Sequence, residues 1–131
     1  MAGKKNTNKN DAIKKDIEKD IAIKKEIRRI KSGLKNIHKD TLKMNEGLIE
    51  HAAYLQVTLV NMKKDLDEIN GWTCEYQNGE NQFGKKKSPE AEVFITLDKS
   101  YREAMKQINE LIPKGTTPID DGFEEFANGK G

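Results

Sequence analysis

The chain has 131 residues, of which 34% are hydrophobic and 35% are charged. This length suits one domain, but so polar a composition predicts no deep globular core, and small chains of this kind usually gain stability from helix packing between subunits. No apolar run approaches the about 18 residues that a membrane span needs, and no secretory apolar region follows MAGKKNTNKN. We therefore expect an extended, oligomeric, helical protein that makes no membrane contact and stays inside the cell that makes it.

The net charge of +2 hides an asymmetry along the chain. Residues 1–47 carry fourteen Lys or Arg against seven Asp or Glu, a balance of +7, whereas residues 48–131 carry ten against fifteen, a balance of −5. The basic front half is a candidate for binding a polyanion.

Cysteine and histidine usage gives no sign of a cofactor. Cys74 is the only cysteine, so no internal disulfide is possible, and His38 and His51 are too far apart in sequence for a metal-ligand pattern. We expect no metal, no cofactor and no catalytic residue.

The N-terminal region reads as a flexible basic arm, residues 1–10, followed by a basic helical segment, residues 11–40. An apolar stripe of near-heptad spacing indicates the helix. Its members are Ile13, Ile17, Ile21, Ile27, Ile30, Leu34 and Ile37. Cations at 4-3-4 spacing form a basic ribbon on the same helix, namely Lys24, Arg28, Lys31 and Lys35. Gly33 weakens the helix near its end, and NIHKD reads as a turn.

A second helix is expected from about residue 41 to residue 70, with Gly71 as a left-handed cap. A sustained heptad seam indicates it, made of Leu48, Ala52, Leu55, Leu59, Met62, Leu66 and Ile69. This seam could pack within one chain or between subunits, and the spacing favours neither.

The stretch GENQFGKK, residues 79–86, comes close to the phosphate-binding loop G-x-x-x-x-G-K-[ST] of nucleoside triphosphatases. It has Lys86 where the Mg²⁺-ligating hydroxyl belongs, and no buried apolar strand precedes it. Trp72, Cys74 and Tyr76 alternate before Asn78-Gly79, a pair typical of two-residue hairpin turns. We interpret the stretch as a hairpin turn and a basic connector.

Ser88-Pro89 begins a third helix, with Ser88 as the N-cap, and Pro113 ends it. Its seam consists of Phe94, Leu97, Tyr101, Ala104, Ile108 and Leu111. Two complementary seams joined by a short connector predict an antiparallel helix pair, about residues 41–70 and 88–112. The predicted fold class is mainly α, with residues 41–113 as a helical oligomerisation core.

The composition changes after Lys114 to the acidic, Gly-rich GTTPIDDGFEEFANGKG, which predicts a flexible tail over residues 114–131. Ile119, Phe123 and Phe126 are spaced i, i+4, i+7 among acidic residues. The tail could therefore fold in a partner's groove, or be a frayed terminus.

The order of these features over residues 41–114 resembles the small terminase subunit of tailed bacteriophages, particularly the type from phages of Gram-positive hosts. The resemblance is carried by GLIEHAAYL, EYQNGENQ, KKSPEAE and KQINELIPK. It implies a DNA-packaging protein that forms a ring, binds double-stranded phage DNA and delivers it to the large terminase subunit in the cytoplasm of the infected host. It also implies that the ATPase and nuclease belong to that large subunit, so the chain itself is expected not to be an enzyme.

Three residue sets follow from this interpretation. Expected DNA-binding residues are Lys14, Lys24, Lys25, Arg28, Arg29, Lys31, Lys35, Lys85, Lys86 and Lys87. For the last three, solubilisation of the connector is the alternative. Expected oligomerisation residues are Leu48, Leu55, Leu59, Met62, Leu66, Phe94, Leu97, Tyr101, Ile108 and Leu111. Expected large-subunit contacts are Ile119, Asp120, Asp121, Phe123, Glu124 and Phe126.

A different class of function also fits the sequence. A charged helix with an apolar stripe is common in coiled-coil scaffold or assembly proteins that have no role on DNA. Salt-sensitive binding of duplex DNA distinguishes the two interpretations.

Overall fold

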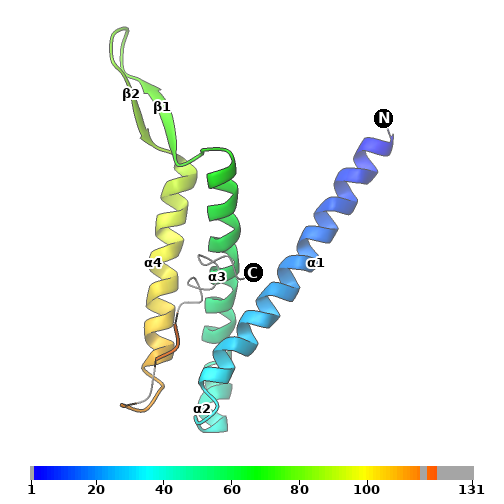
Figure 1. Ribbon diagram of the computed structural model, residues 1–131, viewed down its shortest axis with the longest axis vertical. Coiled ribbons are helices and arrows are strands. Elements are labelled where there is room, and N and C mark those ends of the chain that lie inside the picture. The colour runs from blue at the N-terminus through cyan, green and yellow to red at the C-terminus, as the bar shows by residue number, and fades with distance from the viewer. Residues whose placement is uncertain (1, 116–117, 121–131) are drawn as a thin grey trace.

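The computed structural model describes residues 2–115 and 118–120, with side chains from Lys9 onward. Its body consists of α1 (Ala2–Gly33), α3 (Glu46–Glu68) and α4 (Pro89–Asn109). The short helix α2 (Lys39–Met44) joins α1 to α3, and a hairpin of β1 (Thr73–Gln77) and β2 (Phe83–Lys87) joins α3 to α4. In Figure 1, α3 and α4 run side by side in opposite directions, and the hairpin projects from one end of the pair. The prediction of a mainly helical fold with an antiparallel pair is confirmed.

Helix α1 is 32 residues long, which corresponds to about 48 Å. It begins at Ala2, so the structure describes residues 2–10, which were expected to form a separate arm, as the start of this helix. Only the second half of α1 packs into the core, while its first half diverges from α3 (Figure 1). Near the point of divergence, the Lys19 ammonium lies 4.4 Å from the centre of the Tyr54 ring of α3, a cation–π contact.

The isoleucines of α1 form two stripes rather than the single stripe expected. Ile30 and Leu34 are fully buried, and Ile23, Ile27 and Ile37 pack against the same core. Ile13, Ile17 and Ile21 are 50%, 55% and 59% exposed. The reason is geometric, since Ile17 lies about 140° around the helix axis from Ile30 at 3.6 residues per turn.

The core joins regions that the sequence had assigned to different segments. Ile30 of α1 and Leu34, which directly follows α1, belong to the same buried cluster as Leu59 of α3 and Tyr101 of α4. The second half of the predicted segment 11–40 therefore packs into the same core as α3 and α4.

The two heptad seams meet each other within one chain. Leu55, Leu59, Leu66, Tyr101 and Ile108 are all buried without any partner subunit. Their assignment as direct oligomer contacts is corrected, because these side chains are already covered within the chain, and all but Leu66 belong to the core cluster that α1, α3 and α4 share. The other members of that set are only partly exposed, namely Leu48, Met62, Phe94, Leu97 and Leu111.

Two asparagines break the helices where the sequence pattern did not indicate it. The helix expected from residue 41 to residue 70 is interrupted at Asn45, whose side-chain amide donates to the Thr41 carbonyl at 2.8 Å. At the other end Asn70, with φ of 50°, takes the left-handed position expected for Gly71. The Gly71 N–H then donates to the Leu66 carbonyl at 2.8 Å, which is the bond of a Schellman cap.

The hairpin expected at GENQFGKK is present, but its turn is longer than two residues. Gln77 pairs with Phe83, and the Asn78 N–H donates to the Gln82 carbonyl at 2.7 Å, so residues 79–81 make the tip. Gly79 has φ of 78°, which explains the preference for glycine there. The stretch runs into a strand rather than a helix, so it lacks the context of a phosphate-binding loop.

Ser88 joins the hairpin to α4. Its hydroxyl accepts from the Ala91 N–H at 3.0 Å, as expected for the N-cap, and donates to the Gly71 carbonyl at 2.5 Å. Its own N–H donates to the Trp72 carbonyl at 3.0 Å, and the residue is only 3% exposed. The base of the hairpin is therefore tied to the first turn of α4.

Candidate nucleic-acid interface

The basic ribbon of α1 lies on the outside of the molecule. Lys24, Arg28 and Lys31 follow one face of the helix, and Lys35 continues the series in the turn after Gly33. All four are exposed. From the first to the last, the ribbon measures about 16 Å along a helix axis, or roughly five base-pair steps of one DNA strand.

Few carboxylates compete with this ribbon. Between residues 24 and 39 the single acidic residue is Glu26, which is 8% exposed and turned toward Arg29. One partner from elsewhere approaches, since the Glu46 carboxylate lies 3.8 Å from the Lys31 ammonium, a long contact between exposed groups. The outward surface of this stretch is therefore strongly cationic, and Lys25 adds to it on a neighbouring face.

Arg29 does not belong to this exposed set. Its guanidinium binds Glu26 (Nη2 to Oε1, 2.6 Å) and Asp120 (Nη1 to Oδ1, 3.1 Å), and its side chain is 29% exposed. Burial lowers the pKa of Arg29, but the hydrogen bond and charge of Glu26 and the charge of Asp120 outweigh it, so the pKa lies above its ordinary value. Its expected role as a DNA contact is corrected, because both terminal nitrogens of its guanidinium already bind carboxylates of the same chain.

The three hairpin lysines lie on β2 and are exposed. Lys85 stands opposite Glu75, Lys86 opposite Cys74 and Lys87 opposite Thr73 in the antiparallel register. Glu75 reduces the local positive charge at Lys85 because directly opposed side chains share one face of a hairpin. Near the tip, Phe83 is 71% exposed, so the hairpin presents an aromatic ring beside its cations.

The two basic regions lie at opposite ends of the body. The hairpin projects beyond one end of α3, and the last part of α1 crosses α3 near the other (Figure 1). Helix α3 has 23 residues and is about 35 Å long, roughly one helical turn of DNA. A duplex that met both regions would have to span that length, so they do not form a single compact site.

The remaining predicted residues fall into two groups. Lys14 is exposed on the diverging half of α1, away from the ribbon. Among the expected large-subunit contacts, the structure describes Ile119 and Asp120, which both contact the chain's own body. The other four lie outside the described residues, namely Asp121, Phe123, Glu124 and Phe126.

Sequence reasoning missed the residues that receive Ile119 and Asp120. These are Gly33, Asn109 and the Glu26–Arg29 pair. Gly33 was the only visible signal, because a glycine near the end of a helix can mark close approach of another segment as well as weak helix propensity. Asn109 sits one residue after the buried Ile108, and nothing in its spacing indicates its role.

Within the described residues, no three His, Cys, Asp or Glu side chains are grouped so that they could hold a metal ion. A search of the same residues for a helix long and apolar enough to cross a membrane also finds none. Comparison with protein-family models, with curated proteins and with solved structures gives no significant match.

Proposed function

We propose that this chain is a DNA-packaging protein of the small terminase subunit type. It binds double-stranded phage DNA, assembles into a ring, and delivers the DNA to the large subunit that carries the ATPase and nuclease in the host cytoplasm. The resemblance over residues 41–114 suggests the class. One observation carries the DNA-binding part, namely the exposed cationic stretch from Lys24 to Lys39, whose single carboxylate is turned away.

This stretch suits the phosphate backbone better than base edges. Lysine and arginine side chains neutralise phosphates and release counterions, which gives affinity that depends on salt but little on sequence. Base reading commonly requires side chains such as Asn, Gln or Arg on an element seated in a groove. The ribbon offers one arginine, Arg28, and otherwise only lysines.

Assembly is supported by the apolar surface that one chain leaves uncovered. Ile13, Ile17 and Ile21 follow each other along α1, the first two on its diverging half, and each is at least half exposed. With much of the heptad seams buried inside the body, this stripe is the better candidate for subunit contact. The partly exposed seam residues Leu48, Met62, Phe94, Leu97 and Leu111 could extend such a contact.

In this proposal the acidic tail contacts the large subunit, although two of its residues are already bound to the chain's own body. Ile119 is half-buried in the body and Asp120 is bound by Arg29. A partner that takes up these two residues must displace them first. The other assigned contacts are Asp121, Phe123, Glu124 and Phe126, which lie outside the described residues.

The first experiment is the light-scattering mass of the purified protein, alone and mixed with duplex DNA, at low and at high salt. A ring-sized oligomer that takes up DNA at low salt and releases it at high salt is the expected result. A small oligomer indifferent to DNA at both salt concentrations would refute the packaging proposal.

A second candidate is a helical scaffold protein without DNA binding, and one observation favours it. Ile17 and Lys24 are seven residues apart, so the exposed isoleucines share their face of α1 with the ribbon. A face that is apolar in one half and basic in the other also fits a partner helix with acidic residues. In the scattering experiment, an oligomer whose mass stays the same when DNA is added would support this candidate.

A further inference from the structure

The last two residues that the structure describes, Ile119 and Asp120, contact both α1 and α4 between them. Ile119 packs against the buried core, and Asp120 is bound by Arg29 of α1. Asn109, the last residue of α4, binds the backbone of Ile119. Residues 118–120 thus bridge two helices that are far apart in sequence.

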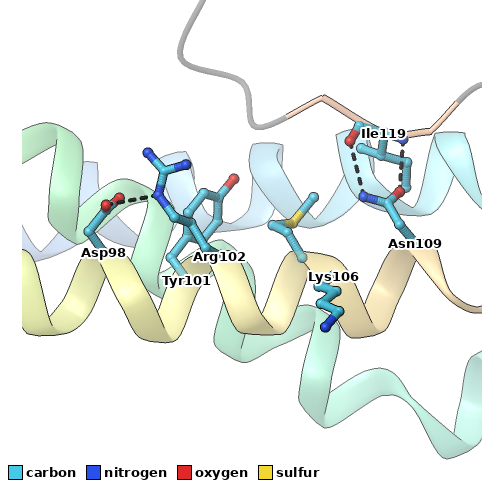
Figure 2. A pocket seen from close by; sticks show the side chains of 7 residues that line it. Asp98, Tyr101, Arg102, Lys106, Asn109 and Ile119 are labelled. Atoms are coloured by element: carbon cyan, nitrogen blue, oxygen red, sulfur yellow. Dashed lines mark hydrogen bonds and ion pairs between the residues drawn. The ribbon is translucent and has the colours of Figure 1, made fainter.

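The side chain of Asn109 forms hydrogen bonds with the backbone of Ile119, as the backbone of a neighbouring β-strand would. The Ile119 N–H donates to Asn109 Oδ1 at 2.9 Å, and Asn109 Nδ2 donates to the Ile119 carbonyl at 3.3 Å (Figure 2). One carboxamide therefore satisfies both polar groups of one residue. This arrangement recognises an extended backbone whatever its side chain.

The side chain of Ile119 enters a space that only glycine leaves open. A Cβ placed on Gly33 would come within 2.5 Å of Ile119 Cγ1 and 2.8 Å of its Cδ1. Gly33 does not have a positive φ, so its backbone conformation does not require glycine. Close approach of the isoleucine accounts for the glycine instead.

The residue after Ile119, Asp120, is bound by the charged side chain of Arg29. Arg29 donates from Nη1 to the Asp120 carboxylate and from Nη2 to the Asp120 carbonyl, both at 3.1 Å. Glu26 holds the same guanidinium through Nε at 2.7 Å, and Glu26 is itself almost fully buried. The guanidinium is thereby oriented before any carboxylate arrives, which favours binding of a fixed geometry.

The seat continues along α4 as a depression of about 320 Å³. Tyr101, Met105, Arg102, Lys106 and Asp98 line it together with Asn109 and Ile119. In Figure 2 the Arg102 guanidinium pairs with Asp98, and the Lys106 side chain points away from Ile119. Tyr101 and Met105 give this depression an apolar part, which suits a further apolar residue of a peptide.

We propose that this seat, made by Gly33, Asn109 and the Glu26–Arg29 pair, is a recognition site for an extended peptide with an aliphatic residue followed by aspartate. The chain's own Ile119-Asp120 occupies it as an exchangeable internal ligand. The occupant in trans is a partner protein's segment of the same chemistry, since every contact made by the seated residues is one that such a segment can reproduce. The inference does not depend on DNA binding.

Exchange is feasible because the ion pair of the internal ligand is open to solvent. The side chain of Asp120 is 72% exposed, so solvent screens its pairing with Arg29. A short tether raises the local concentration of the internal ligand to the millimolar range, and a free peptide must compete against that. Weakening the internal ligand should open the site without removing any part of it.

The test uses the full-length ¹⁵N-labelled chain and the synthetic peptide GTTPIDDG, followed by NMR at the side-chain amide of Asn109 and at Nε of Arg29. In an Ile119→Ser variant, the peptide should return these signals toward their wild-type positions. The unaltered chain should need about ten-fold more peptide, because its site is already occupied. The peptide GTTPSDDG should bind neither protein.

A second variant separates loss of the site from loss of the fold. Gly33→Ala favours the helix but fills the space that Ile119 enters. In the Gly33→Ala, Ile119→Ser double variant, GTTPIDDG should no longer bind, while circular dichroism shows the helices retained. Equal response of wild type and Ile119→Ser to the peptide, or equal binding of both peptides, would overturn the proposal. Signals that change with wild-type concentration alone would mean that a second copy is the occupant, which overturns the foreign-partner assignment.

Discussion

Removing two of the four ribbon cations should halve the salt dependence of DNA binding. If Lys24, Arg28, Lys31 and Lys35 each neutralise one phosphate, log K falls with log salt at a slope of about −3.6 per contacting subunit. Raising salt from 50 to 200 mM then weakens binding about 150-fold. An Arg28→Ala, Lys35→Ala variant keeps two cations, so the slope becomes about −1.8 and the same change weakens binding about 12-fold.

The assay is fluorescence anisotropy of a labelled duplex, titrated with protein at several salt concentrations. A Lys63→Ala, Lys99→Ala variant is the matched control, because it loses the same charge from exposed positions on α3 and α4. The control should retain the wild-type slope. The two-to-one ratio of slopes does not depend on how many subunits contact the duplex, provided that the assembly is unchanged.

Two results would refute the reasoning. Equal slopes for the ribbon variant and wild type would show that the ribbon does not contact phosphates. An equal reduction in the ribbon and control variants would show that binding follows total charge rather than a defined surface of α1.

Three further predictions concern the body, the assembly and the tail. Leu59→Ala removes a fully buried side chain, so unfolding free energy should fall by about 3 kcal/mol and the melting temperature by about 10 °C, measured by circular dichroism. Ile17→Asp changes a side chain that is 55% exposed, so the melting temperature of the fold should hold while the light-scattering mass falls; an unchanged mass would remove this stripe from the subunit contact. Deleting residues 121–131 should keep DNA uptake and assembly but abolish binding to the large subunit in a pull-down, and loss of assembly instead would contradict the role given to the tail.

The sequence predicted the elements whose signals are local. Ser88 and Pro89 specify the start of α4 by chemistry that acts within one turn, and the structure has Ser88 as the N-cap. The two heptad seams predicted an antiparallel pair because apolar spacing survives almost any tertiary environment. The same spacing cannot say which surface covers a seam, and Leu59 and Tyr101 prove to be covered within the chain.

Features set by distant residues were not predictable in this way. Asn70 takes the left-handed position, and Gly71 serves a different purpose, since a Cβ there would approach the side chains of Ile69 and Leu66 at about 3 Å. The sequence placed Ile119 in a free tail. Its partner Gly33 is distant in sequence, and the spacing around its other partner, Asn109, does not indicate a contact.

The candidate interface was predicted in part. The ribbon was visible because its cations repeat at helical spacing, and the structure leaves those four side chains exposed. Arg29 has the same local signal as Arg28, and only the tertiary contacts with Glu26 and Asp120 separate the two. A cation's availability thus depends on which carboxylates the fold brings near it.

The chain's single tryptophan lies at the junction between the hairpin and the helices. The rings of Trp72 and Phe94 pack edge to face, with their centres 5.1 Å apart. The indole N–H of Trp72 donates to the Asp67 carboxylate at 2.7 Å. Its emission therefore reports on this junction and not on the three-helix core around Tyr101. Fluorescence and circular dichroism consequently observe different parts of the molecule during melting, and coincident transitions would mean that hairpin and helices unfold as one cooperative unit.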